Sequence, residues 1–354
     1  MWSIGLDVHQ RQSSVCILDS NGKRIKEFPV RGRWSKLIER LEQINQPFAI
    51  CYEASCGYGY LHDQLRRIAK RVVVAHPGRL RLIFRSKKKN DRVDARKLAT
   101  LLFLDQVPTV YVPSVQVRSW RALIEFRHRL INKRTRTKNE LRAVLRTHGV
   151  EAPSGYKLWT KGGLSWLTEV KLPTSRAALQ RDLTLEELQH LDGQVKRVER
   201  ELNRIAREDP GVQLLQTIPG VGPRTAEAVV AYIDDPARFG RSKQVGSYFG
   251  LVPSQDQSSN ANRLGHITRE GPGTVRKVLT EAAWQGIRRS PRLKNYFERV
   301  RGDDPDRKKI ALIATAHHLV RIMHTMLRTG ETWRPKEDRD AERNKKSTIA
   351  QTAA

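Results

Sequence analysis

The 354-residue chain has few cysteines, few acids beside its many bases, and no long apolar run. Its three cysteines, Cys16, Cys51 and Cys56, form neither a C-x-x-C pair nor an even disulfide set, so we expect buried thiols of a cytoplasmic protein. No apolar stretch approaches ~18 residues, and the N-terminus lacks the apolar core of a signal peptide. These patterns argue against a membrane partner and favour a cytoplasmic location.

The shortage of acids leaves a formal net charge of +29 from 66 Lys and Arg against 37 Asp and Glu. A surplus of this size favours a polyanionic partner, with nucleic acid first and an anionic membrane surface second. The bases gather in two blocks: residues 79–97 hold nine Lys and Arg against two acids, and residues 118–146 hold ten against two. Two solvated helix faces would give the same pattern, but two dense blocks in one basic chain favour a nucleic-acid surface.

The first 105 residues or so alternate between predicted strands and helices in the order β-β-β-α-β-α-β-α. The stretch "WSIGLDVHQ" alternates apolar and polar residues, and the "DSNGK" turn that joins the next two strands is typical of a hairpin. Further strands and helices follow up to "NDRVDARKLATLLF", a helix for which Asn90 or Asp91 would be the cap. This order predicts a mixed sheet flanked by helices, as in the ribonuclease H-like architecture.

Four carboxylates stand out in this region: Asp7 inside the first apolar strand, Glu53 at the end of another, and Asp91 and Asp94 three apart on one helix. In a ribonuclease H-like sheet the first and fourth strands are neighbours, with a helix crossing beside them, so the four acids would converge. Like charges this close require a cation, and carboxylate oxygens beside phosphate suit Mg²⁺ or Mn²⁺. Ordinary roles are the alternative: a helix cap for Asp91, an ion pair with Arg92 or Arg96 for Asp94, and a strand end for Glu53.

The second half is predicted to be mostly helical. Six apolar residues spaced three and four apart form a heptad seam from Leu188 to Ile205, which predicts either a subunit contact or a helix packed within its own chain. The segment "LLQTIPGVGPRTAEAVVAYI" resembles a helix-hairpin-helix, whose glycines and helix N-terminus would meet the nucleic-acid backbone. The predicted nucleic-acid contacts are Lys87, Lys88, Lys89, Arg92, Gly220, Gly222 and Arg224. A polar loop at 254–263 carries Ser258 and Ser259.

Five motifs in order, "GLDVH", "CYEAS", "NDRVDARKLA", "IPGVGPRTAEAVVAYI" and "GLVPSQDQSS…RLGHITREG", resemble the one-ten family of insertion-sequence transposases, relatives of the pilin-gene-inverting recombinases. The resemblance runs from residue 1 to about residue 330. It implies a Holliday-junction-resolvase-like domain whose Asp-Glu-Asp-Asp set maps onto Asp7, Glu53, Asp91 and Asp94. It also implies a serine nucleophile, which maps onto Ser258. Family members often have glycine directly after this serine, so Ser259 is the alternative.

The resemblance further implies a bridge RNA that pairs with donor and target DNA, and a homo-oligomer, either a dimer or a tetramer. It also implies a prokaryotic, nucleoid-associated protein of the cytoplasm. We therefore expect a metal-dependent recombinase that cuts and rejoins DNA through a phosphoserine intermediate. A Holliday-junction-type nuclease that uses water, and a non-enzymatic nucleic-acid-binding protein, are the alternatives. The expected organisation is a ribonuclease H-like domain at 1–110, basic and coiled-coil-like helices at 111–208, a helical transposase domain at 209–332 and a disordered tail at 333–354.

Overall fold

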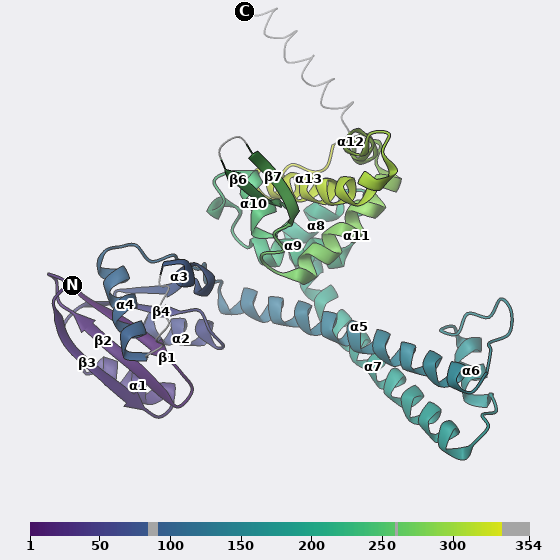
Figure 1. Cartoon of the computed structure of the whole chain (residues 1–354), viewed down its shortest axis with the longest axis horizontal. Coiled ribbons are helices and arrows are strands. Elements are labelled where there is room, and N and C mark those ends of the chain that lie inside the picture. The colour runs from purple at the N-terminus through teal and green to yellow at the C-terminus, as the bar shows by residue number, and fades with distance from the viewer. Residues whose placement is uncertain (84–90, 259–260, 335–354) are drawn as a thin grey trace, which may run out of the picture. The chain divides into compact units, whose positions relative to one another are not determined.

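The computed structural model describes residues 1–83, 91–258 and 261–334, and the chain divides into two compact units (Figure 1). The N-terminal unit comprises residues 1–118 and the C-terminal unit the remainder. The finer division that the sequence suggests, with boundaries at 110, 208 and 332, stays a prediction. Most of the expected tail lies outside the described residues.

The N-terminal unit contains a five-stranded mixed sheet in the order β3-β2-β1-β4-β5. Its strands are β1 (Trp2–Val8), β2 (Gln12–Leu18), β3 (Arg24–Arg31), β4 (Phe48–Glu53) and β5 (Arg71–Ala75). The first three strands are antiparallel, whereas β1, β4 and β5 are parallel. The predicted ribonuclease H-like arrangement, with the first and fourth strands side by side, is confirmed.

A tight turn joins β2 to β3, as the Asn-Gly pair predicts. The Asp19 carboxylate accepts hydrogen bonds from the backbone N–H groups of Asn21 and Lys23, at 2.8 and 2.9 Å. Gly22 has a φ of +79°, a conformation that costs little only for glycine. Local sequence thus favours the antiparallel pairing of β2 with β3.

Helices cover both faces of the sheet (Figure 1). Helices α1 (Trp34–Glu42) and α2 (Tyr58–Leu65) bury their leucines against the face that carries Ile4, Leu6 and Tyr52. Helices α3 (Pro77–Ile83) and α4 (Asp91–Phe103) pack on the opposite face, around Cys51. The cysteine prediction is wrong at one position: Cys16 and Cys51 are buried, but Cys56, in the loop after β4, is exposed.

Two long helices, α5 (Val115–Thr147) and α7 (Ser175–Glu208), run side by side with the short α6 (Lys161–Glu169) between them in sequence (Figure 1). The heptad seam of α7 faces α5 of the same chain: Leu191 and Val195 pack against Leu130, and Leu202 packs near Ile124. Leu191, Val195 and Leu202 are 4%, 3% and 0% exposed within the single chain. The prediction that this seam is a subunit contact is therefore wrong, because α5 already covers it.

We expect Leu202→Ala to lower the free energy of unfolding by about 2–5 kcal/mol, the usual cost of truncating a buried leucine. The oligomeric mass should stay unchanged, because the side chain packs within its own chain. Denaturant unfolding followed by circular dichroism, together with light scattering, measures both quantities. A lower mass at unchanged stability would restore the subunit-contact interpretation.

The rest of the C-terminal unit is a helical domain with one small hairpin. Its elements are α8 (Pro210–Gln216), α9 (Pro223–Ile233), α10 (Ser242–Tyr248), β6 (Pro253–Ser258), β7 (Ala261–Ile267), α11 (Gly273–Arg289), α12 (Pro291–Arg301) and α13 (Lys308–Thr329). The predicted loop at 254–263 is thus a hairpin. Its strand β6 is exposed along its whole length, so no apolar alternation marked it.

One segment of the described chain, Pro305–Thr329, is long and apolar enough to cross a membrane by length and composition. Its apolar window has a mean hydropathy of 1.3, and half of that window is buried in the fold. Ala316, Leu319, Val320 and Met323 belong to the main core of the helical domain. We therefore interpret α13 as the central helix of this domain.

Candidate active site

The end of β1 carries an acid on the sheet face that α4 covers. Successive side chains of a strand point to opposite faces, so Leu6 enters the core beneath α1 and α2 while Gly5 and Asp7 face α4. Parallel pairing continues up to Leu6 opposite Tyr52, which leaves Asp7 and Glu53 as the next residue on each strand. The two acids predicted on these strands therefore lie at neighbouring strand ends.

Gly5 lets α4 approach the sheet unusually closely. A Cβ atom at Gly5 would lie 2.0 Å from the Ala95 carbonyl oxygen and 2.3 Å from the Ala99 nitrogen, so the helix backbone rests directly on the strand. Asp91 and Asp94 lie in the first turn of this helix, one turn before Ala95 and Leu98, which are buried against the sheet. Close packing on Gly5 thus brings the start of α4 beside Asp7.

We expect Gly5→Ala to destabilise the N-terminal unit by about 1–3 kcal/mol, the usual cost of overpacking. It should also weaken divalent-metal binding, because α4 would have to move away from β1. Titration with Mn²⁺ and thermal unfolding measure the two effects. Gly162→Ala is the matched control, since its added methyl group would meet nothing within 4 Å. Metal binding equal to that of the control would contradict this role for Gly5.

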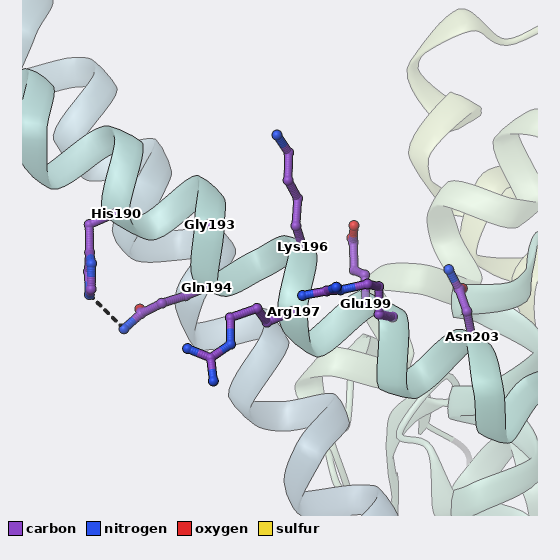
Figure 2. A pocket seen from close by; sticks show the side chains of 8 residues that line it. His190, Gly193, Gln194, Lys196, Arg197, Glu199 and Asn203 are labelled. Carbon is purple, nitrogen blue, oxygen red and sulfur yellow. Dashed lines mark hydrogen bonds between the residues drawn. The ribbon is translucent and has the colours of Figure 1, made fainter.

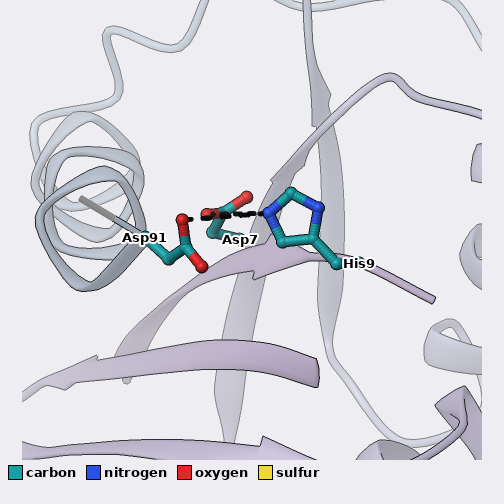
Figure 3. Close-up of side chains that lie close together, drawn as sticks. All are labelled: Asp7, His9 and Asp91. Carbon is teal, nitrogen blue, oxygen red and sulfur yellow. Dashed lines mark ion pairs between the residues drawn. The ribbon is translucent and has the colours of Figure 1, made fainter. Parts of the chain in front are cut away.

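Three side chains meet at this position (Figure 3). The Nε2 atom of His9 lies 3.4 Å from Oδ2 of Asp7 and 4.0 Å from Oδ1 of Asp91. One donor atom from each of the three lies within 4.8 Å of the others, the spacing of a metal-ligand set. The carboxylates come from β1 and α4, and the imidazole follows the last residue of β1.

The electrostatics of this cluster favour a bound cation. Partial burial raises the pKa of Asp7 above its ordinary value, and the carboxylates of Asp91 and Asp94 raise it further, while His9 opposes the shift. A divalent cation among these groups would relieve the repulsion, and carboxylate oxygens are the ligands that Mg²⁺ and Mn²⁺ prefer. The donor set therefore fits such an ion.

The other two predicted acids lie nearby but outside the three-residue cluster. Asp94 forms an ion pair with Lys97 at 3.2 Å. Arg96, one of the two arginines considered as partners of Asp94, instead pairs with Glu27 at 2.7 Å. Asp94 is still close enough to raise the pKa of Asp7. Glu53, the last residue of β4, is exposed. The sequence reasoning missed His9, although its position two residues after Asp7 was a signal that both could reach one site.

Ser258 is the last residue of β6 and is exposed. It pairs with Ala261 across the hairpin, next to residues 259–260, which the structure does not describe. The alternative nucleophile, Ser259, lies outside the described residues. The Ser258 side chain is therefore open to solvent at the end of its strand.

Two family models match the chain in order. The model of DEDD transposases of the IS110 type matches residues 4–149, which include the acidic cluster. The model of the IS116/IS110/IS902 transposases matches residues 212–298, which include the hairpin with Ser258. The chain belongs to this transposase family. A DEDD domain implies the use of divalent metal, and transposition implies that the protein binds DNA and cleaves and transfers its strands.

Curated relatives agree with this assignment. The transposase is 27% identical over 286 residues to the transposase for insertion sequence element IS1111A of Coxiella burnetii, covering 79% of this chain and 76% of the relative. It is 26% identical over 348 residues to a probable family 20 transposase of Pseudomonas aeruginosa, covering 94% and 98% of the two chains. Both alignments extend well beyond either family model alone.

The helix-hairpin-helix residues of the transposase make intramolecular contacts. Gly220 has a φ of +91°, and a Cβ atom there would lie 2.5 Å from the backbone nitrogen of Gly286 in α11. Arg224 bonds Asn203 on α7 and pairs with Glu227 at 3.2 Å. Gly222, at the start of α9, faces open space. Gly220 and Arg224 thus have packing roles, and contacts of this motif with nucleic acid stay a prediction.

Burial dominates the Arg224–Glu227 pair. Glu227 is 1% exposed, and burial raises its pKa to about 8 from an ordinary 4.5 despite the neighbouring arginine. Burial likewise lowers the pKa of Arg224. The folded transposase therefore keeps the Glu227 proton to a higher pH than the unfolded chain does.

This proton makes stability depend on pH. Between about 4.5 and about 8 the folded state keeps a proton that the unfolded state has released, so the free energy of unfolding falls as pH rises. Glu227→Gln should lose less stability than the wild type between pH 5 and pH 8 in urea unfolding. Glu298→Gln, at an exposed position, should keep the wild-type slope. Equal slopes for all three proteins would contradict the raised pKa.

The basic residues of the two blocks, 79–97 and 118–146, differ in their placement and in their contacts. Lys87, Lys88 and Lys89 lie outside the described residues, and Arg92 is in the first turn of α4. Several bases of the second block hold the fold together: Arg127 bonds Glu199 and Arg134 bonds Asp192, which ties α5 to α7. Arg129, Lys133, Arg136, Arg142 and Arg146 are exposed on α5. The exposed set is the part of this block that nucleic acid can reach.

A further basic surface lies on α7, opposite the buried seam (Figure 2). An open groove there is lined by polar and basic side chains that include Lys196, Arg197 and Arg200, and His190 bonds Gln194 at its far end at 2.9 Å. The sequence analysis missed this surface because it considered only the spacing of the apolar residues in α7. The charge on the positions between the heptad residues was the available signal.

Proposed function

We propose that the transposase exchanges DNA strands through a covalent phosphoserine, with Ser258 as nucleophile and a Mg²⁺ or Mn²⁺ site at Asp7, Glu53, Asp91 and Asp94. The observation that carries this proposal is the close approach of α4 to Gly5, which brings Asp91 to the end of β1 beside Asp7 and His9. Asp7 and Asp91 repel each other there, with Asp94 close enough to add to the repulsion, and a bound cation would relieve it.

The chemistry divides the transfer into two balanced steps. The Ser258 hydroxyl attacks a phosphodiester and loses its proton, the Ser258 Oγ–P bond forms, and the leaving strand departs as a protonated hydroxyl. The hydroxyl of the partner strand then attacks the phosphoserine, which frees Ser258 and keeps the number of phosphodiester bonds constant. A divalent metal, when bound, would supply charge stabilisation for the transfer. Asp7, Glu53, Asp91 and Asp94 would hold this metal, and exposed arginine and lysine side chains would orient the DNA strands.

We propose that donor and target DNA are selected by a structured guide RNA. The RNA backbone would be contacted by three sets of basic side chains: Lys87, Lys88, Lys89 and Arg92, the exposed arginines and lysine of α5, and the groove on α7. Contacts with the backbone would be enough, because base pairing would supply the sequence choice. The working protein is a homo-oligomer, a dimer or a tetramer, in the cytoplasm where chromosomal DNA lies. Purified protein should prefer RNA from the element's own ends over random RNA of equal length, with strong salt dependence.

The experiment that separates the functions incubates the transposase with donor DNA, target DNA and the element RNA, with and without Mg²⁺. Strand exchange predicts joint molecules without net hydrolysis, and only when the metal is present. A junction nuclease would give cut ends and no joint molecules. A protein that only binds would leave all strands intact under every metal condition.

A further inference from the structure

A small basic cavity in the helical domain is not explained by any contact described above. It has a volume of about 160 Å³. Its polar lining comes from Ser242 at the start of α10, Arg292 in α12, His318, Arg321, Thr325 and Thr329 in α13, and Glu331 just beyond that helix. Two arginines thus share a cavity with a single acid.

Cations dominate the surroundings of this cavity. The pKa of His318 is lowered to about 4, first by burial and then by Arg292, Arg321, His317 and Arg299. Arg321 and Lys243 likewise lower the pKa of His317 after burial. His318 is therefore neutral at pH 7, and stacking on Tyr296, with the ring centroids 4.2 Å apart, fixes its orientation. A ligand in this cavity meets fixed positive potential.

The hydroxyl groups at the cavity are already engaged. Thr325 donates to the Arg321 carbonyl at 3.0 Å, and the Ser242 hydroxyl lies 3.3 Å from Nδ1 of His324, whose Nε2 donates to the Pro236 carbonyl. The Nε–H of Arg321, by contrast, is buried and has no hydrogen-bond partner among the described residues. The Arg321 guanidinium therefore brings an unused donor to this cavity, and the forked geometry of a guanidinium suits phosphate.

We infer that this cavity binds one phosphate group of a nucleic-acid backbone, held by Arg321 and Arg292. Its volume is below the ~300 Å³ of pockets that enclose drug-sized ligands, so the cavity suits a single phosphate group better than a whole nucleotide. A phosphodiester that belongs to a long strand can enter while its sugar and base stay outside. Glu331 opposes the anion and limits the affinity of this contact.

The inference rests on DNA binding by the transposase, and it is tested by binding alone. Labelled duplex DNA of two unrelated sequences is titrated with the full-length protein at several salt concentrations. Arg321→Gln and Arg292→Gln should each weaken binding equally for both sequences and reduce the salt slope by about one. Glu331→Gln should tighten binding. Arg289→Gln, which removes the same charge from an exposed position outside the cavity, is the control.

Two further measurements identify the source of the phosphate and guard against misfolding. Arg321→Lys keeps the charge, so it should keep the salt slope, and circular dichroism checks that each variant is folded. Slopes for Arg321→Gln and Arg292→Gln equal to that of Arg289→Gln would overturn the inference. So would stabilisation by inorganic phosphate that Arg321→Gln abolishes while its DNA slope stays unchanged, since the cavity would then take free phosphate. Neither result would affect the serine chemistry, because strand exchange is not the readout.

Discussion

Ser258→Ala should abolish strand exchange while leaving DNA and RNA binding within about twofold of wild type. The variant lacks the only atom that would bond to phosphorus, so no covalent intermediate can form. Binding should persist because one exposed hydroxyl contributes little affinity beside many phosphate contacts. Gel analysis of joint molecules and fluorescence anisotropy measure the two properties.

The neighbouring serines provide the controls for this variant. Ser254→Ala removes a hydroxyl from the other end of the same exposed strand and should recombine normally. Ser259→Ala tests the adjacent position, and loss of activity there with full activity in Ser258→Ala would move the nucleophile by one residue. Continued cutting by Ser258→Ala without joining would instead favour a hydrolytic nuclease.

Asp7→Asn should lower strand exchange by about 10³-fold or more and weaken Mn²⁺ binding. An amide keeps the shape of the side chain but removes the negative charge that would hold the cation, and metal stabilisation of a transition state is worth several kcal/mol. The fold should survive and gain some stability, because Asp7 faces two like charges. Isothermal titration with Mn²⁺ and the recombination assay test both parts.

Asp105→Asn is the matched control for this charge change. Asp105 pairs with Arg71 at 2.6 Å on an exposed part of the same unit, and asparagine also tolerates its positive φ of 54°. It should retain metal binding and activity. Wild-type Mn²⁺ affinity in Asp7→Asn would remove Asp7 from the metal site and, with it, the cluster on which the proposal rests.

Local patterns in the sequence were enough to predict the N-terminal fold. Alternating residues in β1 and the Asn-Gly turn define the meander, and the strand-helix order implies that β1 and β4 are neighbours. The same logic placed Asp7 and Asp91 near each other. The role of Gly5 was not predictable, because the contact between this strand and the backbone of α4 depends on tertiary packing. A single glycine in a strand does not indicate which element packs against it.

Charge and apolar period were less informative about partners. The Leu188–Ile205 seam has the same spacing whether α5 of its own chain or another subunit covers it, and only the structure distinguishes the two. Arg224 contacts Asn203 and Glu227 within the chain, a role that the sequence did not reveal, and its predicted contact with phosphate stays a prediction. In a sequence, basic residues that form ion pairs between helices cannot be distinguished from those that bind nucleic acid.

The most direct test of the central claim is to map a covalent protein–DNA adduct. Wild-type transposase is incubated with DNA, guide RNA and Mg²⁺, denatured, digested and analysed by mass spectrometry. The account predicts a phosphodiester-linked nucleotide on the peptide that contains Ser258, absent without metal and absent in Ser258→Ala. Full recombination by wild-type protein with no adduct on any serine of that peptide would contradict it.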